Sequence, residues 1–522
     1  MNVGSAESAS LLTVASQFLY KARSRATEHT EGAALVGLIG VGAVTELLII
    51  FAILRPFSLV AHPQAISVYE PFTVLLGPGT TAIGEFIASV TVAAALYLLA
   101  FAFALRVRGS RSVALILFFS ALFSITLMLT YPPADSDTLS YILDGRMAWI
   151  YGLNPMAIPR TAASSDIFFS VQQCCANLRS TYGPVWQLLT FIPTRLAGDG
   201  FASNEIAFRV ILLPFLTGSA YLASRIAGAR DVRLAPAAAL FVGWSPLLLW
   251  EVAANGHNDI VLCAFALFAL ERAQHRSWTA AFALLTVSVL AKYVTVLLVP
   301  LFVLAVWRAE GKSALWQLAK GALVSVALVA VLFLPFWDGP SSLVGLAASS
   351  PQAGGFAWSP AWFLAVLLHG SQPLPLEISA SGAGQAVRLM SLALFAIAYA
   401  VIVARLWRGR DSLPAACLYC LFFYLMFVAW FFLPWYVSPV VAIGGCLVFE
   451  RPARIAMLFS ITALLAHVVI AWREVLFTGS SGLLEPGTAF ALVFALPFAY
   501  WIAGIPRPAW LASAFGQAAP AT

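Results

Sequence analysis

The amino-acid sequence predicts an all-α protein that crosses a membrane many times. Hydrophobic residues make up 61% of the 522 residues and charged residues only 10%, whereas soluble domains contain roughly 45–50% and about 25%. So few charges could not cover the surface of a soluble protein of this length, so lipid must be the solvent for most of the chain. The apolar runs extend for about 15–25 residues without the alternation of β-barrel strands, and this pattern favours helices. The net charge of +6 therefore does not indicate nucleic-acid binding.

The candidate membrane spans are apolar runs long enough, or nearly long enough, to cross a bilayer as helices. The number of such runs leads us to expect about 12–15 transmembrane helices. They lie near residues 33–54, 81–105, 112–130, 205–224, 234–252, 258–271, 278–291, 293–307, 317–336, 386–404, 413–434, 436–449, 454–472 and 488–505. Two further runs, 184–198 and 360–369, contain prolines or are too short, and they indicate re-entrant or interfacial segments.

Basic residues predict the orientation of the bundle. Most of the 29 lysines and arginines fall in clusters between spans, and all of these clusters lie on one side if 184–198 and 360–369 do not cross. By the positive-inside rule that side is the cytoplasm, which also receives both termini. The stretches 131–183, 253–259 and 337–385 then face outward. A catalytic site, if the protein has one, would lie on the same side. We therefore expect a multi-pass protein of a bacterial inner (plasma) membrane with an outward-facing site.

Four regions follow from this topology. Residues 1–32 carry their charges after their apolar part, unlike a secretory signal, and this order indicates an amphipathic cytoplasmic helix. The other regions are a catalytic transmembrane module at 33–336 that includes the outer loop 131–204, an extracytoplasmic loop at 337–385 and a C-terminal transmembrane module at 386–522.

The first outer loop begins with a predicted surface helix. Asp135 or Ser136 can cap this helix, which we expect to start near Asp137. On it Asp137, Tyr141 and Asp144 share one face because they are spaced i, i+4 and i+7, and the opposite face is apolar. This pattern predicts an interfacial helix that lies along the membrane surface with its carboxylate face exposed.

Carboxylates of this loop are the candidate catalytic groups. Asp137 can accept a proton from an attacking hydroxyl, and the polar face that it shares favours a functional role. Asp135 is the second catalytic candidate, with helix capping as the alternative. Arg146 is explained by an ion pair with Asp144 or by a lipid headgroup. Arg160 is a candidate ligand for a phosphate.

A second polar cluster is the run NGHND between two spans. Gly256 permits a tight turn, and Asn258 or Asp259 can cap the next helix, which is the alternative to a functional role. Asn255, His257 and Asp259 are candidate substrate ligands, because polar residues at a membrane face are costly unless they have a function. Asp259 and Asp137 could also share a divalent cation (Mg²⁺ or Mn²⁺), although no ligand spacing typical of a metal site is present.

Lys292 is the one lysine in the long apolar stretch AAFALLTVSVLAKYVTVLLVPLFVLAV. A lysine deep in a bilayer costs about 2.5–3.5 kcal/mol by insertion scales. If two half-spans meet at Lys292, its ammonium reaches the outer membrane edge, where it suits a phosphate. Snorkelling of the ammonium to lipid headgroups is the alternative.

Several ordered motifs resemble the GT-C glycosyltransferases, above all the polyprenol-phosphate-mannose-dependent mannosyltransferases. The run SDTLSYILDGRMAWIYGLNPMAIP, followed by STYGPVW, is similar to their first outer loop, although Met156 stands where that family has a tyrosine. Further matches are WSPLLLWEVAANGHNDIVL at 244–262 and LAKYVTVLLVP at 290–300, so the resemblance covers roughly residues 130–300.

The resemblance implies a GT-C-like helical bundle with extracytoplasmic juxtamembrane helices. It also implies that Asp137 acts as the general base or positions the acceptor hydroxyl, and that Lys292 meets the phosphate of the donor. Mannose as the transferred sugar rests on the resemblance alone. Tyr182, in the STYGPVW element, joins the candidate substrate ligands.

We therefore expect a membrane glycosyltransferase that moves a sugar from a polyprenyl-phosphate donor to an extracytoplasmic glycan or lipid acceptor. No nucleotide sugar is available outside the cytoplasm, and the sequence carries no GxGxxG or P-loop motif. The alternative is a flippase or transporter of lipid-linked glycan precursors, which would need polar residues along a path through several spans. The candidate substrate ligands are Lys292, His257, Asp259, Asn255, Tyr141, Asp144, Arg160 and Tyr182.

Overall fold

The predicted all-α membrane fold is confirmed. The computed structural model describes residues 31–64, 75–77, 79–132, 137–171, 176–344, 359–369, 381–477 and 484–504. Within these ranges every regular element is a helix, and the only β-pairing consists of two isolated bridges. Residues 1–30 of the amphipathic segment expected at 1–32, Asp135 and parts of the loop 337–385 lie outside the described residues.

Eight helices in the described ranges are long and apolar enough to cross a membrane, or nine if the bent pair Val232–Gly243 and Pro246–Ala254 forms one span. The eight are Glu31–Leu54, α3 (Thr80–Ala104), α4 (Gly109–Met128), Phe201–Arg230 with α8 (Phe201–Val210) and α9 (Leu213–Arg230), Tyr293–Phe336 with α14 (Val299–Glu310) and α15 (Ala314–Phe333), α19 (Gly382–Trp407), Arg451–Ala471 with α22 (Arg451–Leu464) and α23 (Ala466–Ala471), and Leu484–Ala503 with α25 (Leu484–Phe490) and α26 (Leu496–Ala503).

Fewer helices reach the length of a full span than the expected 12–15, for two reasons. The segment Tyr293–Phe336 counts once, although it holds two helices joined at Gly311. Several predicted runs also form shorter helices. These are α10 (Ala235–Gly243), α11 (Pro246–Leu248), α12 (Asp259–Gln274), α13 (Trp278–Ala291), α20 (Leu413–Phe423) and α21 (Ser438–Gly444), with the π-helical turns η4 (Leu249–Ala254) and η9 (Tyr424–Val428) and the 3₁₀ turns η5 (Tyr293–Leu298) and η10 (Pro434–Val437).

The two segments expected not to cross the membrane form only short helices. Residues 184–198 contain α6 (Pro184–Leu189) and α7 (Phe191–Ala197), and residues 360–369 form α17 (Pro360–His369). A helix of at most ten residues is too short to span the hydrocarbon core. The helix predicted near Asp137 is α5 (Asp137–Trp149).

Small residues let the central helices approach closely. Ala237, Ala238 and Ala239 of α10 are fully buried, and α10 packs against α9 and α4. A Cβ on Gly445 would collide with Val242, so only glycine permits that contact. Peripheral helices instead expose large apolar side chains, such as Leu323 of α15. This division is typical of a bundle surrounded by lipid.

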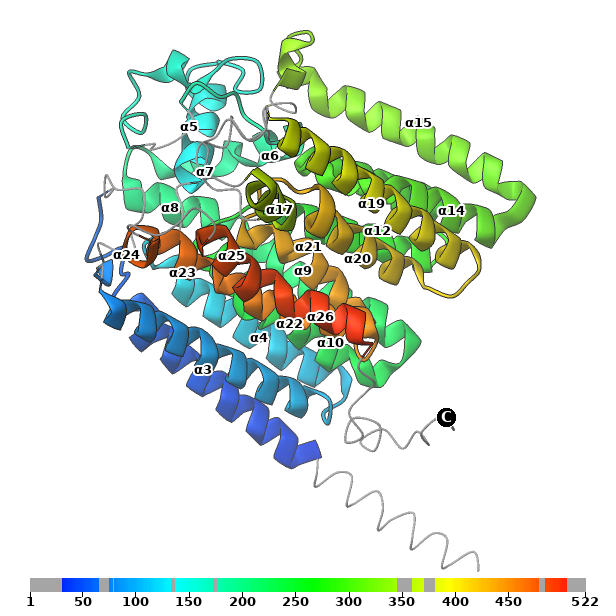
Figure 1. Cartoon of the computed structure of the whole chain (residues 1–522), viewed down its shortest axis with the longest axis horizontal. Helices are drawn as coiled ribbons and strands as arrows, with labels where there is room; N and C mark the ends of the chain where they lie inside the picture. Colours follow the sequence, from blue (N-terminus) through cyan, green and yellow to red (C-terminus); the bar gives the residue numbers. More distant parts are fainter. Residues whose placement is uncertain are drawn as a thin grey trace, which may run out of the picture.

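The helices that directly follow α4 along the chain gather at one end of the bundle, which we call the site end. In Figure 1, α5, α6, α7 and α8 lie together at the upper left, and the long helices run away from them toward the lower right. The turns α3–α4, α9–α10, α14–α15 and α19–α20, which carry basic clusters, lie at the opposite end. The assignment of all basic clusters to one side of the membrane requires that these turns lie at the same end of the bundle. Which side of the membrane each end faces stays a prediction.

Candidate functional site

Three side chains, one from the same helix and two from distant parts of the chain, surround the Asp137 carboxylate. The hydroxyls of Tyr141 and Tyr182 donate hydrogen bonds to Asp137 Oδ2 over 3.3 and 3.1 Å. His257 Nδ1 lies 3.7 Å from the same oxygen. The Asp137 side chain is 25% exposed, whereas His257 is fully buried. The carboxylate is therefore held from one side and accessible from the other.

Backbone geometry brings these residues together. Gly183 packs so tightly on the end of α13 that a Cβ would collide with the carbonyl oxygen of Leu290, and this contact places the neighbouring Tyr182 at the site. Gly256 has a φ of +78°, a left-handed conformation that favours glycine, and the resulting turn aims His257 back toward α5. The Thr138 hydroxyl donates to the Asn255 carbonyl over 2.9 Å and joins α5 to that turn.

The two half-spans predicted to meet at Lys292 are present. Helix α13 ends at Ala291, Lys292 is extended (φ −154°, ψ 123°), and η5 follows. Lys292 Nζ donates to both oxygens of Asp259 over 2.8 and 2.9 Å. The ammonium also lies 4.8 Å from the ring centroid of Tyr436 and 5.8 Å from that of Tyr182. Lys292 thus has structural partners and also borders the Asp137 cluster through Tyr182.

A cavity of about 540 Å³ opens beside Lys292. Its polar lining includes Tyr182, Asp259, Lys292 and Arg388, and the rest is mainly apolar, from η5, α20, η9 and η10. The Arg388 guanidinium lies 5.1 Å from the ring centroid of Trp430. Arg388 was missed in the sequence because it lies near the start of a long apolar run, far along the chain from the recognised motifs.

His257 is enclosed by residues that the sequence analysis did not single out. The Trp435 ring stacks on the His257 ring, with centroids 3.6 Å apart and planes 15° from parallel. Glu251 Oε2 lies 3.3 Å from His257 Nε2, and Glu251 Oε1 lies 2.7 Å from His467 Nε2. A lone carboxylate and a lone histidine inside apolar runs were the available signals for Glu251 and His467.

Most of the carboxylate face of α5 is buried, so the prediction of an exposed face is wrong for Tyr141 and Asp144 and holds in part only for Asp137. Tyr141 and Asp144 are fully buried, because α6, α7, α8 and residues 153–171 cover the helix. Asp144 is paired with Arg160, whose Nε and Nη2 donate over 2.7 and 2.9 Å. Asp144 and Arg160 therefore neutralise each other. Their ion pair is not one of the contacts that hold the Asp137 carboxylate.

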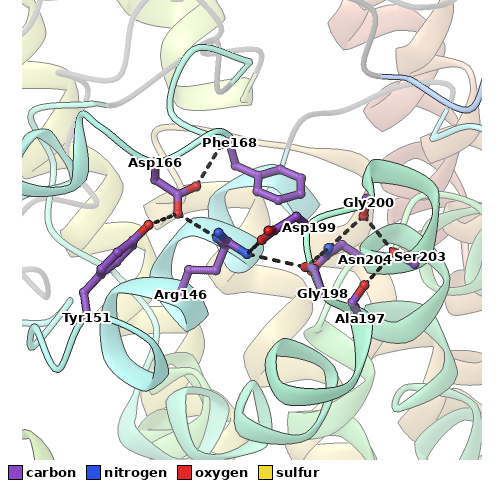
Figure 2. Close-up of polar contacts among 10 residues, drawn as sticks. All are labelled: Arg146, Tyr151, Asp166, Phe168, Ala197, Gly198, Asp199, Gly200, Ser203 and Asn204. Carbon is purple, nitrogen blue, oxygen red and sulfur yellow. Dashed lines mark hydrogen bonds and ion pairs between the residues drawn. The ribbon is translucent and has the colours of Figure 1, made fainter.

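Arg146 does not pair with Asp144, contrary to the sequence-based expectation. Figure 2 shows its guanidinium between Asp166 and Asp199, with ion-pair distances of 2.7 and 2.8 Å. Tyr151 also donates to Asp166, over 2.7 Å. These contacts join the loop after α5 to the α7–α8 turn, so they shape the walls of the site end.

The electrostatic surroundings favour the ionised form of Asp137. Burial opposes its ionisation, but His257, Lys292 and the Tyr182 hydroxyl outweigh burial and hold the pKa of the Asp137 carboxyl below its usual value. Burial and the nearby Asp137 charge raise the pKa of Tyr182, so that phenol remains a donor. The described residues include no group of three or more His, Cys, Asp or Glu side chains suited to a metal ion, and the divalent cation stays a prediction.

Comparison with known proteins identifies similar sequences. The sequence model of the alpha-(1->6)-mannopyranosyltransferase N-terminal domain matches residues 39–308, which is slightly more than half of the chain. Alpha-(1->6)-mannopyranosyltransferase A of Mycobacterium tuberculosis is 21% identical over 346 residues. That alignment spans 63% of this chain and 65% of the relative, so it covers less than two thirds of the relative's length.

The Asp144–Arg160 pair predicts a loss of stability on substitution. Asp144→Asn should lower the free energy of unfolding by about 3–5 kcal/mol, because Arg160 would remain buried without a countercharge. Thermal unfolding in detergent would measure this, with Asp199→Asn, whose side chain is 76% exposed, as the matched control. An unchanged melting temperature would contradict the structural role of the pair.

Proposed function

Because the chain belongs to the alpha-(1->6)-mannopyranosyltransferase family, we propose that it transfers a mannosyl unit from a polyprenyl phosphate to a hydroxyl of an extracytoplasmic glycan or lipid acceptor. One observation carries this proposal. Tyr182 donates to Asp137 and, with Lys292, lines the adjoining cavity, so a proton acceptor and a cation border one space.

The cavity suits a lipid phosphate. Apolar residues such as Leu425 and Val428 line most of it, and they can hold isoprenoid units. Lys292 and Arg388 supply two cations on that lining. An ammonium has three donors, of which two reach Asp259, so one remains for a phosphate oxygen. Arg388 adds a planar fork suited to phosphate.

Asp137 would act on the acceptor. As the acceptor oxygen attacks the anomeric carbon, its proton passes to the Asp137 carboxylate, and the bond from the anomeric carbon to the phosphate oxygen breaks. The phosphate leaves with the electron pair, beside Lys292. Attack from the face opposite the phosphate inverts the anomeric centre. The lowered pKa of Asp137 supports this role, since a carboxylate must be ionised to accept the proton.

An outward-facing site accounts for the donor class. The site end lies opposite the turns that carry basic clusters, and such turns favour the cytoplasm. Nucleotide sugars are not available on the side of the membrane opposite the cytoplasm. A membrane-anchored donor is the remaining source of activated sugar there.

The first test supplies the purified protein with radiolabelled polyprenyl-phosphate-mannose and mannose-containing acceptors in detergent. We expect transfer by the wild type and a loss of about 10²–10⁴ in kcat for Asp137→Asn, which removes the proton acceptor at nearly constant shape. Phe-for-Tyr substitution at exposed Tyr221 is the matched control and should leave the rate unchanged.

Two outcomes would contradict the proposal. Asp137→Asn activity above about a tenth of wild type would exclude Asp137 as the base, because the expected loss is at least tenfold larger. Movement of the lipid-linked sugar across liposomes without any new glycosidic bond would favour a flippase instead.

A second test isolates the charge of Lys292. Lys292→Met alone would strand the buried Asp259 carboxylate, so the informative variant is the double change Lys292→Met with Asp259→Asn. A charge-assisted contact to the donor phosphate is worth about 1.5–3 kcal/mol, and its loss should lower kcat/KM roughly ten- to a hundredfold.

The control for that test is Asp259→Asn alone. It keeps the ammonium, so it should retain most of the donor affinity that the double variant loses. Equal kinetics in the two variants would show that Lys292 serves only to neutralise Asp259, and the phosphate site would then have to be sought elsewhere.

A further inference from the structure

Four ionisable side chains form a continuous chain from the surface of the site into the core. From Asp137 the chain passes to His257 at 3.7 Å, then to Glu251 at 3.3 Å and to His467 at 2.7 Å. They come from α5, the turn at Gly256, η4 and α23. Carboxyl groups and imidazoles alternate along this chain, so each carboxylate lies next to a group that can carry a positive charge.

Glu251 has no exposure to water, and neither has either histidine beside it. An ionised carboxylate is strongly destabilising in such a place unless a cation pairs with it. Asn255 adds one amide at 3.4 Å. Other charges near the chain already have partners: Asp259 is held by Lys292 and Glu205 by Arg209. Among the described residues, the side chains beside Glu251 that can carry a positive charge are the two imidazoles.

We propose that Glu251 is a positioning residue that keeps His257 protonated and oriented, and through His257 keeps Asp137 ionised for catalysis. His467 holds Glu251 in place from behind. This inference rests on the proposed function of Asp137 as the base, and it assigns a role to two core residues on different elements.

The stacked indole supports a charged His257. A cation over the face of a tryptophan is attracted by the ring, and the attraction grows when water is excluded. Trp435 lies parallel to His257 at 3.6 Å, and both are buried. The indole and Glu251 therefore favour the same protonation state, and the contact with Glu251 fixes which nitrogen faces Asp137.

The expected consequence appears in the pH dependence of transfer. An opposite charge within about 4–6 Å lowers a carboxyl pKa by about 1–3 units. If Glu251→Gln leaves His257 neutral, Asp137 loses that support and stays protonated to higher pH. The acid limb of the kcat/KM profile should then move upward by about 1–3 pH units, while the rate well above that limb largely recovers. The remaining titratable groups facing the chain, Tyr141, Tyr182, the Asp259–Lys292 pair and the Glu205–Arg209 pair, are unchanged in this variant.

The experiment measures pH–rate profiles for transfer from polyprenyl-phosphate-mannose by wild type, Glu251→Gln and Glu205→Gln. Glu205 is the matched control, because it is an equally buried carboxylate in an ion pair with Arg209 that does not contact His257. Both variants should lower thermal stability, but only Glu251→Gln should move the acid limb. A uniform loss of rate at all pH values, or an equal shift in the control, would overturn the proposal.

Substitution of His467 keeps the test decisive if Glu251→Gln does not fold. His467→Gln retains an N–H that can donate to Glu251, whereas His467→Leu does not. We expect the acid limb to stay nearer to wild type in the former and to shift upward in the latter. Identical profiles in both would contradict the role of His467. Absence of transfer by the wild type would instead refute the proposed function itself.

Discussion

A carboxylate taken out of water inside a membrane protein must be paired, and this constraint organises the whole site end. Asp144 is paired with Arg160 and Asp259 with Lys292, and Glu251 lies between two histidines that can carry a positive charge. Asp137 differs, because its side chain is partly exposed and its partners are a histidine and two phenols. It is the carboxylate that can change its protonation without stranding a buried charge.

The site is assembled from both halves of the chain. Asp137, His257 and Lys292 come from the first 336 residues, whereas Arg388, Trp435 and His467 come from the last 137. The cavity beside Lys292 lies between these halves, lined by η5 on one side and by α19, α20 and η9 on the other. The predicted modules 33–336 and 386–522 therefore both contribute residues to the lining of this cavity.

Hydropathy predicted the helices well because lipid imposes one rule on every span: apolar side chains and internally satisfied backbone. Motif order likewise drew attention to Asp137, His257 and Lys292, which the fold brings near one another. Pairing could not be predicted, since a lone ion in an apolar run shows that a partner exists but not which one. Asp144 was therefore expected on an exposed face, and Glu251 was not singled out.

In the proposed reaction, the donor's phosphate and first isoprene units occupy the cavity beside Lys292. A polyprenyl phosphate with a photoreactive diazirine near its phosphate, followed by peptide mapping, tests this directly. We predict labelling of the segment 421–431, seven of whose residues line that cavity, and loss of labelling when unmodified polyprenyl phosphate competes. A second cavity of about 650 Å³ lies between the helix Glu31–Leu54 and α3. Competable labelling there, with residues 421–431 unlabelled, would contradict the account.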